Sequence, residues 1–106
     1  MIELDNLKQL IEDTTELTDD ESKNDWYVAD VYSIESNLFG DGKCEHETLA
    51  AQVEVYCEYM DIRDAKVDLL RKELQKQENY TQPTTELLFD EIADRYRATL
   101  NFKIFR

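Results

Sequence analysis

The chain has 106 residues, of which 42% are hydrophobic, and this length suits one domain, residues 1–106, with one core. Its formal net charge of −13 argues against a nucleic-acid-binding protein, because such proteins neutralise phosphates with clustered Lys and Arg. No apolar run is long enough for a membrane span or a signal-peptide core, so we expect a soluble protein that is not exported and contacts no membrane.

The first predicted element is an amphipathic helix that ends near Leu17. Apolar residues recur in it at helical spacing, and acids stand in the first turn, where the helix dipole favours them. Residues 18–25 contain no apolar side chain, so they predict a solvated connection. The connection is not a calcium loop, because the alternating oxygen ligands, the central glycine and the closing glutamate of such loops are missing.

The stretch from Trp26 to Tyr59 predicts a β-hairpin. Apolar and polar residues alternate from Ala51 to Tyr59 with the period of a half-buried strand. The first arm has apolar residues on both faces, which indicates a strand covered on both sides. The chain's only two glycines lie between the arms, in Gly40-Asp41-Gly42-Lys43, and suit a turn that needs positive φ.

A second helix is predicted from Ile62 to about Gln77, with Asp61 as its N-cap. Its expected core stripe consists of Ile62, Ala65, Leu69, Leu70 and Leu74, with Val67 at the margin. Pro83 interrupts the pattern after this helix. Residues 85–92 suit a helix or a strand, and we favour a strand that pairs with the last one through a turn at residues 93–94.

Residues 96–105 alternate between an apolar face and a face that carries Arg97 and Lys103, which predicts the last strand. The order is then helix, strand, strand, helix, strand, strand. We predict an α+β fold, with an antiparallel sheet of about four strands and two helices packed on one face. The expected shared core consists of Val53, Val55, Leu70, Leu74, Leu100 and Phe102.

Catalytic and metal-binding motifs are missing from the sequence. His46 is the only histidine, so a Ser-His-Asp or Cys-His centre would depend on a residue beside a predicted turn. Cys44 and His46 could share a strand face, but two ligands do not complete a zinc site, and Cys57 suits a plain thiol in the core. Because P-loop, GxGxxG and GxSxG sequences are also missing, we expect no enzyme, no metal and no cofactor.

Charge is divided unevenly along the chain. Residues 1–64 contain 18 acidic and 4 basic residues, whereas residues 65–106 contain 7 acidic and 8 basic residues. Three interpretations stay open: an acidic surface that keeps the protein in solution, a specific electrostatic role, or head-to-tail association of the two portions, which favours rings.

Short motifs stand in order along most of the chain, and their residues are Tyr32, Gly40-Asp41-Gly42-Lys43, Gln52-Val53-Glu54-Val55-Tyr56 and Tyr96-Arg97. This succession resembles the tail terminator and tail completion proteins of long-tailed bacteriophages and prophages. Two features depart from the family pattern. Trp26-Tyr27 precedes the strand without the usual proline, and residues 85–94 diverge.

The resemblance implies a subunit of a ring, often a hexamer, at the head-proximal end of the tail tube in the virion, with assembly in the host cytoplasm. Its partners would be further copies of the chain, the tail tube protein and the head connector or completion protein. DNA would pass through the ring without specific binding, and an acidic lumen suits that passage because it repels phosphate. At the interface between subunits we predict Asp41, Lys43, Arg97 and Lys103.

Two other function classes compete with this interpretation. An acidic inhibitor that mimics DNA, and so blocks a nuclease or another DNA-binding protein, explains the net charge directly. It explains neither the basic face of the last strand nor the motif resemblance. An assembly chaperone or adaptor module is the third possibility.

Overall fold

The computed structural model describes residues 2–33 and 48–105. These residues form the helices α1 (Ile2–Thr15) and α2 (Met60–Gln75) and the strands β1 (Trp26–Ser33), β2 (Thr48–Cys57), β3 (Thr84–Asp90) and β4 (Arg95–Phe105). The α+β class and the order of elements are therefore as predicted. Neither helix is long and apolar enough to cross a membrane. The predicted glycine turn at residues 40–43 lies outside the described residues.

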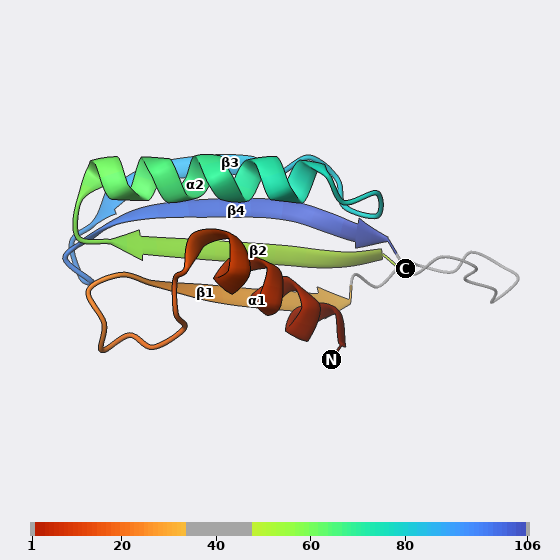
Figure 1. The fold of residues 1–106 in the computed structure, drawn as a ribbon, viewed down its shortest axis with the longest axis horizontal. Coiled ribbons are helices and arrows are strands. Elements are labelled where there is room, and N and C mark those ends of the chain that lie inside the picture. Colours follow the sequence, from red (N-terminus) through yellow and green to blue (C-terminus); the bar gives the residue numbers. More distant parts are fainter. Residues whose placement is uncertain (1, 34–47, 106) are drawn as a thin grey trace, which may run out of the picture.

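The four strands form one antiparallel sheet in the order β1-β2-β4-β3 (Figure 1), so β1 and β3 are its edges. Residues 84–90 are strand β3 rather than the alternative helix, and the predicted turn joins them to β4. Asp94 lies in this turn with φ 55°, a left-handed conformation in which Asp is enriched relative to most residues.

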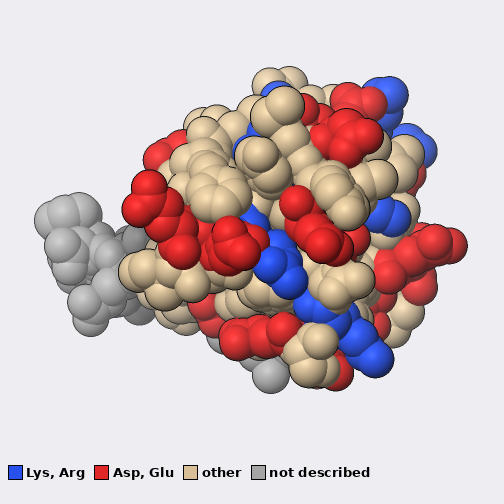
Figure 2. Space-filling view, turned by 90° about the vertical axis from the view of Figure 1, so that its left-hand side faces the viewer, with Lys and Arg blue, Asp and Glu red and all other residues tan. Residues whose placement is uncertain are grey.

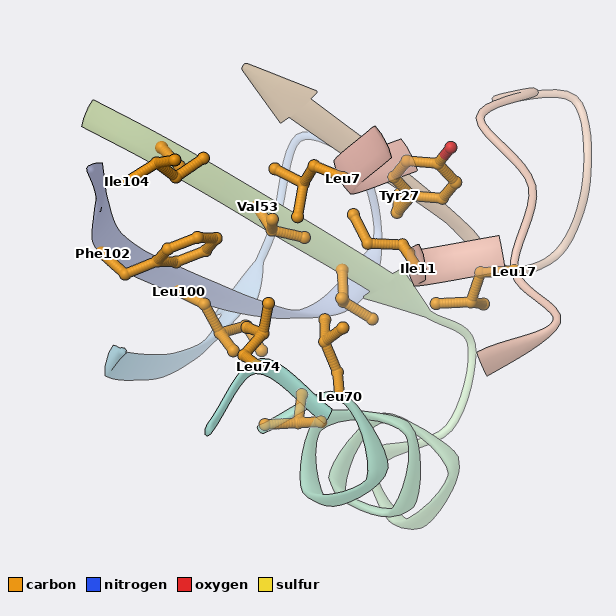
Figure 3. Close-up of a cluster of buried hydrophobic side chains, with 14 of the residues drawn as sticks. Leu7, Ile11, Leu17, Tyr27, Val53, Leu70, Leu74, Leu100, Phe102 and Ile104 are labelled. Carbon is orange, nitrogen blue, oxygen red and sulfur yellow. The ribbon is translucent and has the colours of Figure 1, made fainter. Parts of the chain in front are cut away.

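Both helices pack on the same face of the sheet, and one hydrophobic core fills the space between the two layers (Figures 1 and 3). Residues along β2 alternate between buried and half-buried, as the pleat of a strand requires. The predicted shared core is confirmed, because one buried cluster contains Val53, Val55, Leu70, Leu74, Leu100 and Phe102.

Helix α1 buries Leu7 and Ile11 in this core. It ends at Thr15, two residues before the predicted end. The Thr15 hydroxyl donates a hydrogen bond to the Ile11 carbonyl (2.6 Å) and accepts one from the Leu17 N–H (3.2 Å), and Glu16 is left-handed with φ 62°. The Thr15 side chain therefore links the last turn of the helix to the connection that follows it.

The buried face of α2 is rotated relative to the predicted stripe, and it consists of Arg63, Val67, Leu70 and Leu74. Three members of the predicted stripe are exposed instead: Ile62, Ala65 and Leu69. The helix also begins at Met60, after the N-cap residue Tyr59, so the predicted N-cap role of Asp61 is wrong. The Asp61 carboxylate lies in the first turn and accepts a hydrogen bond from the next backbone N–H at 3.0 Å.

Arg63 explains the rotation of α2. Its guanidinium lies 5.7 Å from the centroid of the Tyr96 ring, and Nη1 donates hydrogen bonds to the carbonyls of Leu88 (3.3 Å) and Arg97 (3.4 Å). Its other partner is the Asp64 carboxylate, at 2.8 Å. The aliphatic stem of an arginine packs like an apolar residue when its head group finds partners. A pattern that counts only apolar residues therefore misplaces this helix face.

Candidate functional site

The sheet face turned away from the helices, which we call the open face, carries the charged residues of the four strands and half of their aromatic residues. In the described part of the chain neither helix covers it (Figure 1). The strand registers place on it Trp26, Val28, Asp30 and Tyr32 of β1, Gln52, Glu54 and Tyr56 of β2, Arg97, Thr99, Asn101 and Lys103 of β4, and Glu86, Leu88 and Asp90 of β3.

A charged cluster centres on Arg97. Its Nη1 lies 3.0 Å from Asp90 Oδ2 and 3.7 Å from Glu54 Oε2. The Tyr56 hydroxyl donates a hydrogen bond to Glu54 Oε2 at 2.9 Å. Burial and this hydrogen bond raise the pKa of Tyr56, so its hydroxyl remains a donor well above neutral pH. The cluster thus joins β2, β3 and β4 through side chains as well as through backbone pairing.

Aromatic rings extend the cluster toward β1. Trp26 stacks on Tyr56 with ring centroids 5.0 Å apart, and the Arg95 guanidinium lies 5.4 Å from the Trp26 ring. The indole is consequently buried although it lies on the open face, and the next residue, Tyr27, is buried on the helix face. The expectation that this strand is covered on both sides is right at its start and wrong farther along, where Tyr32 is exposed.

The predicted interface residues do not form one group. Arg97 and Lys103 share the open face, but six residues separate them along β4, a distance of about 20 Å. Arg97 is engaged by carboxylates of its own chain. Lys103 is exposed, and within the described residues no carboxylate pairs with its side chain. Asp41 and Lys43 lie outside the described residues, as do Cys44 and His46.

Two hollows lie at opposite ends of the open face. One of about 430 Å³ is lined by Glu21, Trp26, Val28, Tyr56, Asp90, Ile92 and Ala93. The other, of about 480 Å³, is lined by residues that include Tyr32, Ala50, Thr84, Asn101 and Lys103. A third hollow, of about 770 Å³, lies between the two helices. Stacking and ion pairing surround the first of these hollows, through Trp26, Tyr56 and Asp90.

The described residues offer no metal site, because nowhere among them do three or more His, Cys, Asp or Glu side chains gather in a way that could hold an ion. Cys57 is a free, buried thiol. Burial, with the nearby Asp25 charge, raises the pKa of Cys57 to about 12, which keeps the sulfur protonated and unreactive at neutral pH.

The end of the molecule where β1 and β4 begin is rich in acids. The loop of residues 18–25, the first turn of α2 and the β3–β4 turn meet there, and each of them contributes Asp or Glu. Figure 2 shows that Lys and Arg side chains form a narrow band across this end, bordered by acidic groups. Three arginines at this end, Arg63, Arg95 and Arg97, make hydrogen bonds within the chain.

Sequence reasoning missed the partners of Arg97. Alternation places Glu54 and Tyr56 on a polar face of their strand, but it does not say which residue of another strand lies opposite. That information is in the register, which sets Tyr56 opposite Arg97. Asp90 could not be assigned either, because its strand was expected from an ambiguous segment. Comparison with known proteins adds no assignment, since neither a scan of protein-family models nor a search of curated proteins found a significant match.

Proposed function

We propose that this chain is a ring-forming structural subunit that caps the head-proximal end of a phage tail tube and joins the tail to the head connector. The observation that carries the proposal is the convergence of separate motifs on adjacent strands. Tyr56 ends one motif and is the register partner of Arg97, which ends another, and Glu54 lies 3.7 Å from the Arg97 guanidinium. Residues of two of the motifs that resemble tail terminators thus lie in one cluster.

The two sheet edges support self-association. An unpaired edge strand presents backbone donors and acceptors to any chain that can pair with them, and a closed ring of head-to-tail contacts removes both edges at once. Edge strand β3 also leaves Leu87 51% exposed and Phe89 43% exposed on the helix side of the sheet. In a monomer these two apolar side chains remain exposed to water, whereas contact with a neighbouring copy would bury them.

The charge of the chain agrees with a channel for DNA. A ring of copies that each carry −13 repels phosphate, so DNA slides through it without adhering. The DNA-mimic alternative needs carboxylates that stand free to replace phosphates. The two half-buried acids described on the open face, Glu54 and Asp90, are bound to Arg97 instead.

The test is capping of tail tubes. The tail tube protein of the same phage or prophage is polymerised with and without the chain, and tube lengths and ends are measured by electron microscopy. We expect tubes of limited length with a ring at one end. Tubes of unchanged length without rings would contradict the proposal, and competition with DNA for a nuclease would favour the mimic.

A further inference from the structure

We infer that neighbouring copies of this chain join their sheets edge to edge, with β3 of one copy antiparallel to β1 of the next, Val31 opposite Leu87 and Ala29 opposite Phe89. This inference rests on the proposed ring and names the contact that would close it. It replaces an interface of opposite charges by one of backbone hydrogen bonds and apolar side chains.

The hydrogen bonds of the neighbouring strand β4 show which backbone N–H and C=O groups of β3 face away from the sheet. Lys103 and Phe105 of β4 bond to residues 79–81, which follow α2 and lie on the β3 side of β4. Backbone groups of alternate residues point to the same side of a strand, so Arg97 and Thr99 also point toward β3. Their register partners Leu88 and Glu86 therefore point back toward β4. The N–H and C=O groups of Thr85, Leu87 and Phe89 consequently face away from the sheet.

The backbone N–H and C=O groups of β1 that face away from the sheet are identified in the same way, from one hydrogen bond of Tyr27. The Tyr27 N–H donates to the Thr18 carbonyl at 2.9 Å, so it points away from β2. Ala29 and Val31 continue this alternation and direct their N–H and C=O groups outward. Among the described residues no other backbone group bonds to these two. The free part of this edge therefore begins after Tyr27.

Strand directions make the two edges compatible. The sheet is antiparallel throughout, so its outermost strands β1 and β3 run in opposite directions. Copies placed side by side in the same orientation then bring β3 next to a neighbour's β1 in the antiparallel sense that the rest of the sheet already uses. Such contacts are head to tail, and repeating them closes a ring when the rotation permits.

The side chains select the register. Ala29, Val31, Leu87 and Phe89 all lie on the helix side of the sheet, so pairing them keeps apolar residues on one face. Placing Val31 opposite Leu87 covers both exposed apolar residues of β3 with half-buried residues of β1. A shift by two residues in one direction would set Phe89 against Tyr27, whose N–H is already bonded to Thr18. The opposite shift would set Leu87 against the polar residue Ser33.

A disulfide between copies tests this register. In it Tyr32 and Glu86 form a non-hydrogen-bonded pair on the open face, with Cα atoms about 4.5 Å apart, close enough for a disulfide. Both are exposed, so cysteines are tolerated there. The native cysteines are first replaced (Cys44→Ser, Cys57→Ala), and Tyr32→Cys and Glu86→Cys are then introduced together. This variant is oxidised in two states: assembled on tail tubes, and free in solution at high concentration. We expect covalent multimers.

The matched control moves one cysteine by two residues. Tyr32→Cys with Thr84→Cys separates the Cα atoms by about 8 Å, too far for a disulfide, so cross-linking should fall at least tenfold. Equal cross-linking of the two variants, or rings on capped tubes without cross-links, would overturn the pairing and leave the proposed function standing. If the parent neither associates nor caps tubes, both fail. Cross-linking of Leu87→Cys alone would indicate a two-fold β3–β3 dimer and would also overturn the inference.

Proline substitutions test the same edge without cross-linking. Leu87→Pro removes an N–H that faces outward, so the isolated subunit should keep its circular dichroism spectrum while association falls at least tenfold. Leu88→Pro removes an N–H that faces β4, so it should lower the melting temperature. Normal association of a folded Leu87→Pro variant would contradict the edge contact.

Discussion

Among single residues, Arg97 has the most consequential surroundings. It holds the carboxylates of Glu54 and Asp90 on the open face, and its side chain is 27% exposed. Partial burial weakens the screening that makes fully exposed ion pairs contribute little. Arg97, predicted to lie at the interface between subunits, is thus paired with carboxylates of its own chain, and we expect it to stabilise the sheet.

Replacing Arg97 should therefore destabilise the isolated subunit. Arg97→Gln leaves two nearby carboxylates without their cation, and we expect the free energy of unfolding to fall by about 1–3 kcal/mol. Urea unfolding followed by circular dichroism measures this change. Lys103→Gln, on the same strand and face, is the control and should change the free energy by less than about 0.5 kcal/mol. Equal, small effects would show that the cluster does not stabilise the fold.

Among the elements, α1 is attached to the sheet by a polar contact as well as by its apolar stripe. The Tyr27 hydroxyl of β1 donates a hydrogen bond to the Glu12 carboxylate of α1. Burial, followed by this hydrogen bond, raises the pKa of Tyr27 above its ordinary value. The docking of α1 on β1 therefore depends on a hydroxyl that stays protonated.

This docking should weaken in alkali. The pKa of Tyr27 is higher in the folded state than the unfolded value of about 10, so above that pH the unfolded chain loses a proton that the folded chain keeps. The free energy of unfolding then falls with pH, by up to about 1.4 kcal/mol per unit for this one group. Urea unfolding at several pH values should show a shallower fall for Tyr27→Phe than for Tyr32→Phe, the exposed control. Equal slopes would contradict this account.

Sequence periodicity predicts the elements better than it predicts their contacts. Alternation in β2 and β4 is strong because each has one face in the core, and it was sufficient to predict the shared core. It failed for α2 because Arg63, a charged residue, occupies a core position through its stem and its hydrogen bonds. The Arg97 cluster depends on the order β1-β2-β4-β3, a property of tertiary packing that no local pattern contains.

For the whole molecule, the net charge of −13 opposes any contact between copies. An interface of opposite charges would have to overcome this repulsion with ion pairs that are each worth about 0–1 kcal/mol when exposed. Backbone pairing and apolar burial at the sheet edges do not depend on charge. The two kinds of interface therefore respond to salt in opposite ways.

Association of the free subunit should strengthen as salt is added. Raising sodium chloride from about 0.05 M to about 0.5 M screens the repulsion between copies but leaves edge pairing intact. Light scattering at a fixed protein concentration should show a larger average mass at the higher salt concentration. Leu87→Pro is the control and should stay monomeric at both. Dissociation on adding salt would instead favour the charged interface.

The uncapped edges of β1 and β3 also bear on the timing of assembly. In the proposed assembly both edges are present on every newly made chain, so edge pairing alone does not distinguish a copy on the tail tube from a copy in solution. Electrostatic repulsion between copies sets a threshold concentration below which free subunits do not associate. A surface that gathers several copies locally exceeds that threshold, because linked weak contacts act at a high effective concentration. The end of the growing tail tube would then be the surface on which the ring assembles.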